Sequence, residues 1–265
     1  MNKRKLQAGL DAGHINTKAI IMKGQEVLGY GTAPTGFDVV GAAQTALNNA
    51  SENAGVSLGE LGGVVATGIF KDMIDSPSLK VTGAVPEFMS GAKGALFLNK
   101  DSRTVIDIGG NVHKAVCYDQ KGDLLDIIQN DKCADGVGIY YSTMAKALGL
   151  NEQELTELAL KSTKNLSVAI QCGLSAETDA IDLMCQGEDI ADVAAAILRY
   201  VAQRVADMST YMSLTKEIVV AGGIAKSQVI IDHLSGLLKQ DISVLKHPEY
   251  VGAIGAVISD GGENE

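Results

Sequence analysis

One short motif occurs twice in this chain of 265 residues. Residues 11–20 read DAGHINTKAI, and residues 107–116 read DIGGNVHKAV. Each copy begins Asp-x-Gly, has a lysine seven residues after the aspartate, and continues with Ala and a β-branched residue. An apolar, strand-like stretch precedes each copy, and a second strand and a glycine turn follow it. The chain therefore repeats a strand–turn–strand unit, which predicts a duplicated α/β architecture.

The segments between and after the two copies alternate helical and strand patterns. Residues 38–55 have helical spacing and end on Gly55, a typical helix stop. Residues 120–122 are expected to turn a hairpin, and residues 216–238 read as a buried strand, a Gly-Gly turn and a helix. We expect two lobes, residues 1–102 and residues 103–265, with no flexible linker between them.

Composition and charge exclude several classes of protein. The net charge of −10 argues against a surface that binds duplex nucleic acid, which needs clustered Lys and Arg. No apolar run reaches the roughly 18–20 residues that cross a bilayer. The basic start of the chain is followed by an apolar run that an Asp and a Gly interrupt, without a cleavage pattern, so we do not expect a signal peptide. These features favour a cytoplasmic protein.

A strand that ends in Asp-x-Gly is suited to binding phosphate and a metal ion. Glycine allows a tight turn and lets phosphate approach backbone N–H groups, and a carboxylate can hold a hydrated Mg²⁺. A third turn, Gly222–Gly223, follows an apolar strand, where an adenosine could pack against backbone. Any one of these turns alone is more often an ordinary tight turn. Two matched copies with a Gly-Gly turn downstream predict that the chain binds a nucleotide polyphosphate.

The order of these motifs resembles a known superfamily. DAGHINTK, ATG, TVIDIGG and VVAGGIA follow one another as in the actin-like and sugar-kinase superfamily of two-lobed ATPases. NDKCADGVG at residues 130–138, and AET at residues 176–178 just after Cys172, resemble one branch: the activators of 2-hydroxyacyl-CoA dehydratases and the ATPase subunits of benzoyl-CoA reductase. This resemblance implies duplicated ribonuclease-H-like units, with the nucleotide bound in the cleft between the lobes.

The resemblance also implies roles for individual residues. Asp11 and Asp107 are expected to hold Mg²⁺ through water, and ATP or ADP is the expected nucleotide. The expected contacts to the β- and γ-phosphates are Gly13, Asn16, Thr17, Lys18, Gly109, Gly110 and Asn111. Gly222, Gly223 and Ala225 are expected on the adenosine side. Lys114 is the duplicate of Lys18, and a solvated strand residue is an equal alternative for it.

The four cysteines separate into two pairs by their surroundings. Cys133 and Cys172 each precede a predicted helix, where free N–H groups stabilise a thiolate. Cys117 lies in a strand pattern and Cys185 in a helical one, and we expect both to serve packing. A [4Fe–4S] cluster usually takes four thiolates, so two subunits would supply four. The resemblance implies this arrangement, whereas from the residues alone a ligand role and a buried inert thiol are equal alternatives for Cys133 and Cys172.

The resemblance implies a function in anaerobic metabolism. Such proteins use ATP to pass a low-potential electron, received from ferredoxin or flavodoxin, to an acyl-CoA dehydratase or an aromatic-ring reductase. The expected assembly is a homodimer, or a heterodimer with a similar ATPase subunit. A small-molecule kinase for a sugar or acyl substrate, and a non-catalytic nucleotide-binding subunit, are the alternatives.

Three departures from the pattern of this branch affect hydrolysis more than binding. His14 and Ile15 stand where Ser or Thr is usual, Asn111 and Val112 stand where Gln-Asp is frequent, and Gly91 replaces a common His. Ile15 cannot donate a hydrogen bond to phosphate. We therefore expect the departures to affect the speed of hydrolysis, and they suit one member of an unequal subunit pair.

Overall fold

The computed structural model describes residues 6–74, 77–130, 136–169 and 172–260. Contacts divide the chain into two compact units. The first comprises Met1–Val105, Val116–Leu125 and Leu245–Glu265, and the second comprises Ile106–Ala115 and Asp126–Val244. The division into lobes at residues 102 and 103 stays a prediction.

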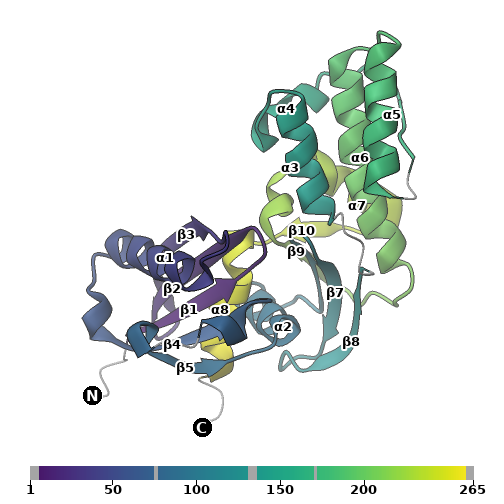
Figure 1. Ribbon diagram of the computed structural model, residues 1–265. Coiled ribbons are helices and arrows are strands. Elements are labelled where there is room, and N and C mark those ends of the chain that lie inside the picture. The colour runs from purple at the N-terminus through teal and green to yellow at the C-terminus, as the bar shows by residue number, and fades with distance from the viewer. Residues whose placement is uncertain (1–5, 75–76, 131–135, 170–171, 261–265) are drawn as a thin grey trace. The chain divides into compact units, whose positions relative to one another are not determined.

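A five-stranded sheet forms the centre of the first unit (Figure 1). Its strand order is β3-β2-β1-β4-β5, in which β1, β2 and β3 are antiparallel neighbours and β4 and β5 continue in parallel with β1. The strand bounds are β1 Leu6–Ala12, β2 Asn16–Lys23, β3 Glu26–Pro34, β4 Leu61–Thr67 and β5 Val81–Ala84.

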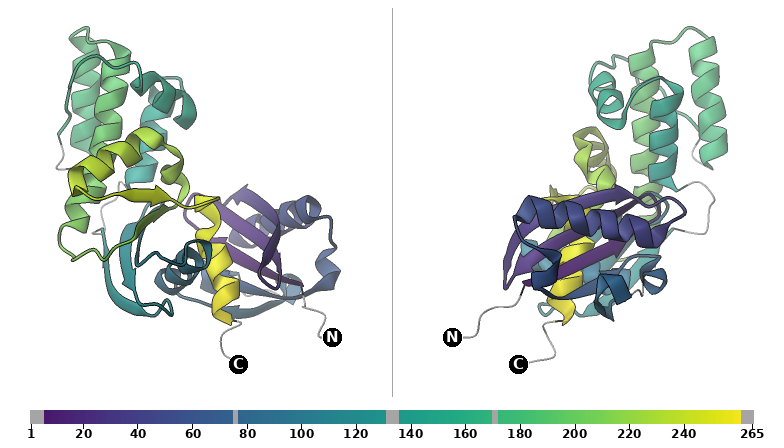
Figure 2. Two further views of the ribbon diagram at one scale, coloured as in Figure 1. Left: turned by 180° about the vertical axis from the view of Figure 1, so that it is seen from behind. Right: turned by 60° about the vertical axis from the view of Figure 1, so that its left-hand side comes forward.

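Helices cover both faces of this sheet because its strands are apolar on both sides. Ile21 packs in a core with residues of α1 (Val39–Ala54), whereas Ile20 and Met22 pack in a second core with α8 (Val251–Asp260). Successive side chains of a strand point to opposite faces, so α1 and α8 lie on opposite sides of the sheet, as Figure 2 shows. A further helix, α2 (Glu87–Leu98), packs along α8.

The helix α1 confirms the prediction for residues 38–55. The Asp38 side chain accepts a hydrogen bond from the Gly41 N–H at its N-terminus, and Gly55 ends it in the left-handed conformation. Both features satisfy backbone groups that a helix end leaves without partners.

The second sheet has the order β10-β9-β6-β7-β8. Three consecutive strands are again neighbours, β6, β7 and β8, as β1, β2 and β3 are in the first sheet, which confirms the predicted repeat. Gly122, at a positive φ of 77°, turns the chain between β7 and β8 where the hairpin was predicted. The strand bounds are β6 Thr104–Ile108, β7 His113–Tyr118, β8 Leu124–Gln129, β9 Ile218–Ala221 and β10 Ile242–Val244.

The helices of the second unit pack around α6 (Figures 1 and 2). This 20-residue helix buries its alanine-rich side against α3, α4, α5 and α7. Small side chains allow helices to approach closely on several sides. The bounds are α3 Val137–Ala147, α4 Glu152–Ala159, α5 Gly173–Cys185, α6 Ile190–Ser209 and α7 Gln228–Leu238.

Candidate functional site: two aspartate turns and a helix-capping cysteine

The first aspartate turn, residues 11–18, links β1 to β2 and contains a close ion pair. Asp11 and Lys18 are register partners in the antiparallel pair, and the Lys18 Nζ lies 3.1 Å from the Asp11 Oδ2. Their side chains keep 15% and 20% of their surface exposed, so solutes still reach the carboxylate. A Cβ at Gly13 would lie 2.9 Å from the Asn16 carbonyl oxygen, so this tight turn favours glycine.

Two threonine hydroxyl groups fix the backbone of this turn. The Thr35 Oγ1 donates its proton to the Gly13 carbonyl oxygen at 2.7 Å. Because a hydroxyl has one proton, the Thr17 hydroxyl must be the donor in its 3.0 Å bond to the Thr35 Oγ1. Thr17 is also fully buried, so its side chain stabilises the turn. Asn16 is exposed beside it.

The unusual residues at the tip of the turn point outward. His14 is exposed and its ring centroid lies 5.2 Å from that of Phe70, and Ile15 is 45% exposed. The Ile15 carbonyl oxygen accepts a hydrogen bond from the Thr35 N–H at 2.9 Å. The backbone of the turn is therefore held even though neither side chain at its tip provides a hydroxyl group.

The N-terminus of α8 approaches the Asp11 carboxylate. A Cβ at Gly252, the second residue of α8, would lie 3.3 Å from the Asp11 Oδ2. The positive end of a helix dipole favours a nearby negative charge. Lys18 and the start of a helix that comes from the far end of the chain thus both lie beside the Asp11 carboxylate.

The second aspartate turn, residues 107–114, repeats the ion pair. The Lys114 Nζ lies 3.5 Å from the Asp107 Oδ2, and Lys114 is 4% exposed. A buried ammonium group requires an anionic neighbour, so Lys114 is a paired residue of the turn and the alternative of a solvated strand residue is wrong. The Gly109 N–H donates to the Val112 carbonyl oxygen at 3.0 Å and closes the turn.

The third glycine turn lies directly against the second aspartate turn. Gly222 has φ of +90°, and a Cβ there would lie 2.3 Å from the Ile108 carbonyl oxygen and 2.7 Å from the Asp107 Oδ1. Only glycine allows both this conformation and this approach. Gly223 is exposed beside it, whereas Ala225 is buried. Asp107 and the predicted adenosine turn therefore share one surface of the second unit.

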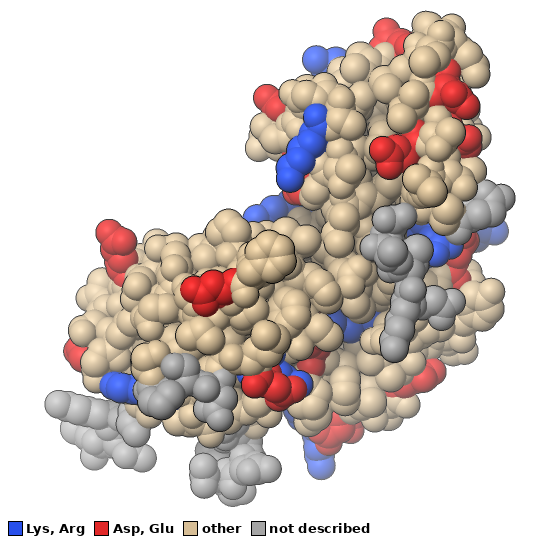
Figure 3. Space-filling model, in the orientation of Figure 1, with Lys and Arg blue, Asp and Glu red and all other residues tan. Residues whose placement is uncertain are grey.

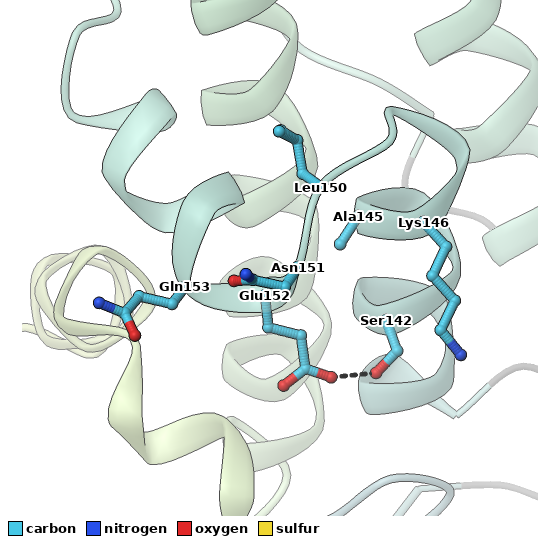
Figure 4. A pocket seen from close by; sticks show the side chains of 7 residues that line it. All are labelled: Ser142, Ala145, Lys146, Leu150, Asn151, Glu152 and Gln153. Carbon is cyan, nitrogen blue, oxygen red and sulfur yellow. Dashed lines mark hydrogen bonds between the residues drawn. The ribbon is translucent and has the colours of Figure 1, made fainter.

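A pocket that the sequence did not predict lies between α3 and α4 (Figure 4). Its volume is about 350 Å³, and the Ser142 hydroxyl donates to the Glu152 carboxylate across it. Farther along α4, Thr156 hydrogen-bonds with Ser227, which directly follows the 3-10 helix Gly223–Lys226. The lining residues are Ser142, Ala145, Lys146, Leu150, Asn151, Glu152 and Gln153.

Cys172 caps the N-terminus of α5. Its Sγ accepts a hydrogen bond from the Ser175 N–H at 3.4 Å, and the side chain is half-buried. An N–H donor and the helix dipole both stabilise a thiolate at this position. Cys133, the other predicted cluster ligand, lies outside the described residues. Among the described residues, no three His, Cys, Asp or Glu side chains are placed to hold one metal ion.

Two carboxylates hold the chain that leads to Cys172. The Asp179 Oδ2 accepts a hydrogen bond from the Ala169 N–H at 2.7 Å. The Asp192 Oδ1 accepts from the N–H groups of Thr163 and Lys164 and from the Ser162 hydroxyl. The Lys164 N–H, followed by the Ser162 hydroxyl and the Thr163 N–H, lowers the pKa of Asp192, although burial opposes this shift.

The other two cysteines differ from each other. Cys117 is buried in β7, and its Sγ lies 3.2 Å from the Thr104 hydroxyl, which confirms its packing role. Cys185 is exposed at the last position of α5, so the prediction that it serves packing is wrong. The helical period was correct, but the face that residue 185 occupies points to solvent.

Charged side chains of both signs are scattered over the face shown in Figure 3. No helix in the described part of the chain is long and apolar enough to cross a membrane.

The two sheets and the paired aspartate turns define the class of the protein: an α/β protein with the fold of actin-like ATPases and sugar kinases. A ROK family glucokinase from Streptomyces griseus shares this fold with a TM-score of 0.58 at 14% identity, a likeness that concerns the fold alone. Residues 8–259 match the model of the BadF/BadG/BcrA/BcrD ATPase family, and the chain belongs to that family.

Three similar proteins illustrate the range of the family. The chain is 31% identical to the activator of lactoyl-CoA dehydratase from Anaerotignum propionicum, over 94% of this chain and 95% of the activator. The activator of the 2-hydroxyisocaproyl-CoA dehydratase from Clostridium difficile, solved with bound ADPNP, has a TM-score of 0.89 and 28% identity over 97% and 95% of the two chains. One of the subunits of benzoyl-CoA reductase from Thauera aromatica is 28% identical, over 82% of this chain and 77% of that protein.

Proposed function

We propose that this protein is an ATP-hydrolysing iron–sulfur activator that passes a low-potential electron to an acyl-CoA dehydratase or to an aromatic-ring reductase. The observation that carries the proposal is the Asp–Lys ion pair, which is built once in each unit beside a glycine turn. The ATPase family supports the nucleotide, and the relatives named as dehydratase activators support the electron-transfer task.

Asp11 and Asp107 hold Mg²⁺ through water in this proposal. Both carboxylates are partly exposed, at 15% and 29%, and carboxylate oxygens suit a Mg²⁺ ion that keeps most of its waters. Before the ion binds, Lys18 and Lys114 offset the carboxylate charge, and they leave a cation beside each turn for phosphate. The proposed phosphate contacts are Gly13, Asn16, Thr17 through its backbone, Lys18, Gly109, Gly110 and Asn111.

The adenosine part of the nucleotide lies against Gly222 and Gly223 in this proposal. Gly223 offers exposed backbone, and a Cβ there would meet no atom within 4 Å, so the surface beside it is open. The buried Ala225 supports this turn from behind. ATP and ADP both bind through these groups, and only ATP adds the γ-phosphate contacts to the aspartate turns.

The chemistry of Cys172 fits an iron–sulfur cluster. A half-buried thiolate at a helix N-terminus, with an N–H donor to its sulfur, is the environment that such clusters use. When bound by Cys133 and Cys172 of two subunits, a [4Fe–4S] cluster supplies the one-electron centre. The assembly is then a dimer of like or similar subunits, and ferredoxin or flavodoxin is the electron donor.

Iron content of protein purified without oxygen tests this function. We expect about four iron atoms per dimer and a broad absorption band at about 400 nm. The variant Cys172→Ser loses most of this iron, whereas Cys185→Ser, at the opposite end of the same helix, retains it. An iron-free wild type, or a Cys172→Ser protein with its full iron content, contradicts the proposal.

A nucleotide-binding subunit without fast hydrolysis is a second candidate. It is favoured by the tip of the first aspartate turn, where the exposed Ile15 offers no hydroxyl group to phosphate. Phosphate release measured with the protein alone and with the similar subunit of a heterodimer separates the two candidates. A small-molecule kinase is disfavoured, because it gives no role to the thiolate environment of Cys172.

A further inference from the structure

Ser175 directs two polar groups at the sulfur of Cys172. Its backbone N–H donates to the Cys172 Sγ at 3.4 Å, and its hydroxyl Oγ lies 3.3 Å from the same sulfur. Cys172 stands at the N-cap position with an extended backbone, φ −156° and ψ 162°, so its side chain folds back over the first turn of α5. A single residue of that turn therefore places two groups that can donate beside the sulfur.

The hydroxyl of Ser175 is not bonded as helix hydroxyls usually are. Serine and threonine inside a helix commonly donate back to a carbonyl oxygen four residues earlier, as Thr178 does to Leu174 at 3.0 Å. Ser175 instead contacts a sulfur three residues earlier. A sulfur that is ionised or bound to iron carries no proton and only accepts, so in that state the Ser175 hydroxyl is the donor.

The two hydrogen bonds depend on the sequence in different ways. Any residue except proline supplies the backbone N–H at position 175, whereas the hydroxyl requires serine or threonine. Both Cys172 and Ser175 are half-buried, and the next residue, Ala176, is fully buried. Water therefore competes less for the sulfur than at an exposed position, and the lower local dielectric strengthens the hydroxyl bond.

Hydrogen bonds to sulfur are among the factors that set the reduction potential of an iron–sulfur cluster. Reduction adds a negative charge, so a donor stabilises the reduced form more than the oxidised form. We propose that the Ser175 hydroxyl, acting through the Cys172 sulfur, raises the reduction potential of the cluster. It thereby favours uptake of one electron from the ferredoxin or flavodoxin donor, which is oxidised as the cluster is reduced. This inference rests on the proposed function, in which Cys172 is a cluster ligand.

Redox titration of protein purified without oxygen, with electron paramagnetic resonance detection and saturating ADP, tests the role of this hydroxyl. Ser175→Ala keeps the backbone N–H bond and loses only the hydroxyl. We expect its reduction equilibrium to shift at least about threefold toward the oxidised cluster, which lowers the potential by about 30 mV for one electron. Ser175→Thr keeps a hydroxyl and should retain the wild-type potential within about 10 mV.

Thr178→Ala is the matched control on the same helix. It removes a hydroxyl that donates to a backbone carbonyl oxygen rather than to sulfur, so its potential should also stay within about 10 mV of wild type. We expect the iron content of each variant to equal that of the wild type. The role of the hydroxyl is overturned if Ser175→Ala keeps the wild-type potential, if Ser175→Thr or Thr178→Ala shifts as far as Ser175→Ala, or if Ser175→Ala loses its iron. A wild type without iron overturns the proposed function and this inference together, and that result is seen before any variant is compared.

Discussion

The Asp–Lys pairs are the residues on which nucleotide chemistry depends in this account. Each aspartate is the last but one residue of its strand, and each lysine follows seven residues later on the next strand, so a hairpin brings them together. Another Asp–Lys pair, Asp123 with Lys93 at 2.9 Å, belongs to neither turn; its carboxylate is 64% exposed, and the pair provides a comparison.

Replacement of either turn aspartate should abolish most hydrolysis. In the proposed function Asp11 and Asp107 hold Mg²⁺, and Asp11→Asn or Asp107→Asn would remove one of these charges. We therefore expect the rate of phosphate release to fall at least about 100-fold, the effect of about 3 kcal/mol on the barrier. Asp123→Asn should change the rate less than about twofold. Equal rates for Asp11→Asn and Asp123→Asn would show that the first turn does not bind the metal ion.

Burial of His113 makes the stability of the protein depend on pH. Burial, and then the nearby Arg204 charge, lower the pKa of His113 to about 4, although a hydrogen bond to the Arg204 backbone opposes this. The unfolded chain takes up this proton near the ordinary pKa of 6.5, so the free energy of unfolding falls as pH drops from 6.5 towards 4.

The pH effect of His113 can be isolated by comparison with His113→Leu. Between pH 7.5 and pH 5 this residue should contribute a loss of about 2 kcal/mol, which the leucine variant lacks. Urea denaturation at both pH values measures how much unfolding free energy each protein loses between pH 7.5 and pH 5. An equal loss in the wild type and the variant would mean that His113 is not buried in its neutral form.

At the scale of elements, glycine contacts decide which helices and strands can meet. The helices α2 and α8 cross at two glycines: a Cβ at Gly94 would lie 2.1 Å from the Val251 carbonyl oxygen, and one at Gly255 would lie 1.7 Å from the Ser90 carbonyl oxygen. This crossing holds α8 in the position where its N-terminus approaches Asp11.

Two glycines of α2 should respond in opposite ways to the same substitution. Gly94→Ala forces the helices apart and should lower the free energy of unfolding by about 2–3 kcal/mol. Gly91→Ala, where a Cβ would meet no atom within 4 Å, should raise it by up to about 1 kcal/mol, since alanine favours helix. Urea denaturation of the two variants measures this contrast, which disappears if α2 and α8 do not cross closely.

At the scale of the whole molecule, the sequence predicted local structure better than it predicted contacts between distant segments. The repeated strand–turn–strand units, the glycine stop of α1 and the helix that begins after Cys172 follow from local propensity, and the structure confirms each. The two aspartate–lysine ion pairs were not predicted, although each joins residues seven positions apart within its own hairpin.

Contacts between distant segments could not be predicted in this way. Gly222 packs on Asp107, Asn130 bonds with Asn111, and Gly252 approaches Asp11, and each depends on how sheets and helices pack. The exposed position of Cys185 was missed for the same reason: helical spacing gives a face, but packing decides whether that face is covered. The predicted site residues lie within short motifs, whereas the residues that pack against those motifs are distant from them in sequence.

The proposed function requires that nucleotide binding change the reduction potential of a [4Fe–4S] cluster held by this protein. The most direct measurement is the reduction potential of the anaerobically purified protein, determined by titration with electron paramagnetic resonance detection, with ADP and with a non-hydrolysable ATP analogue. We predict a one-electron signal of a [4Fe–4S] type whose potential differs by at least about 60 mV between the two nucleotides, a tenfold change in the equilibrium. The same potential with both nucleotides, or no such signal in protein that binds ADP, would contradict the account.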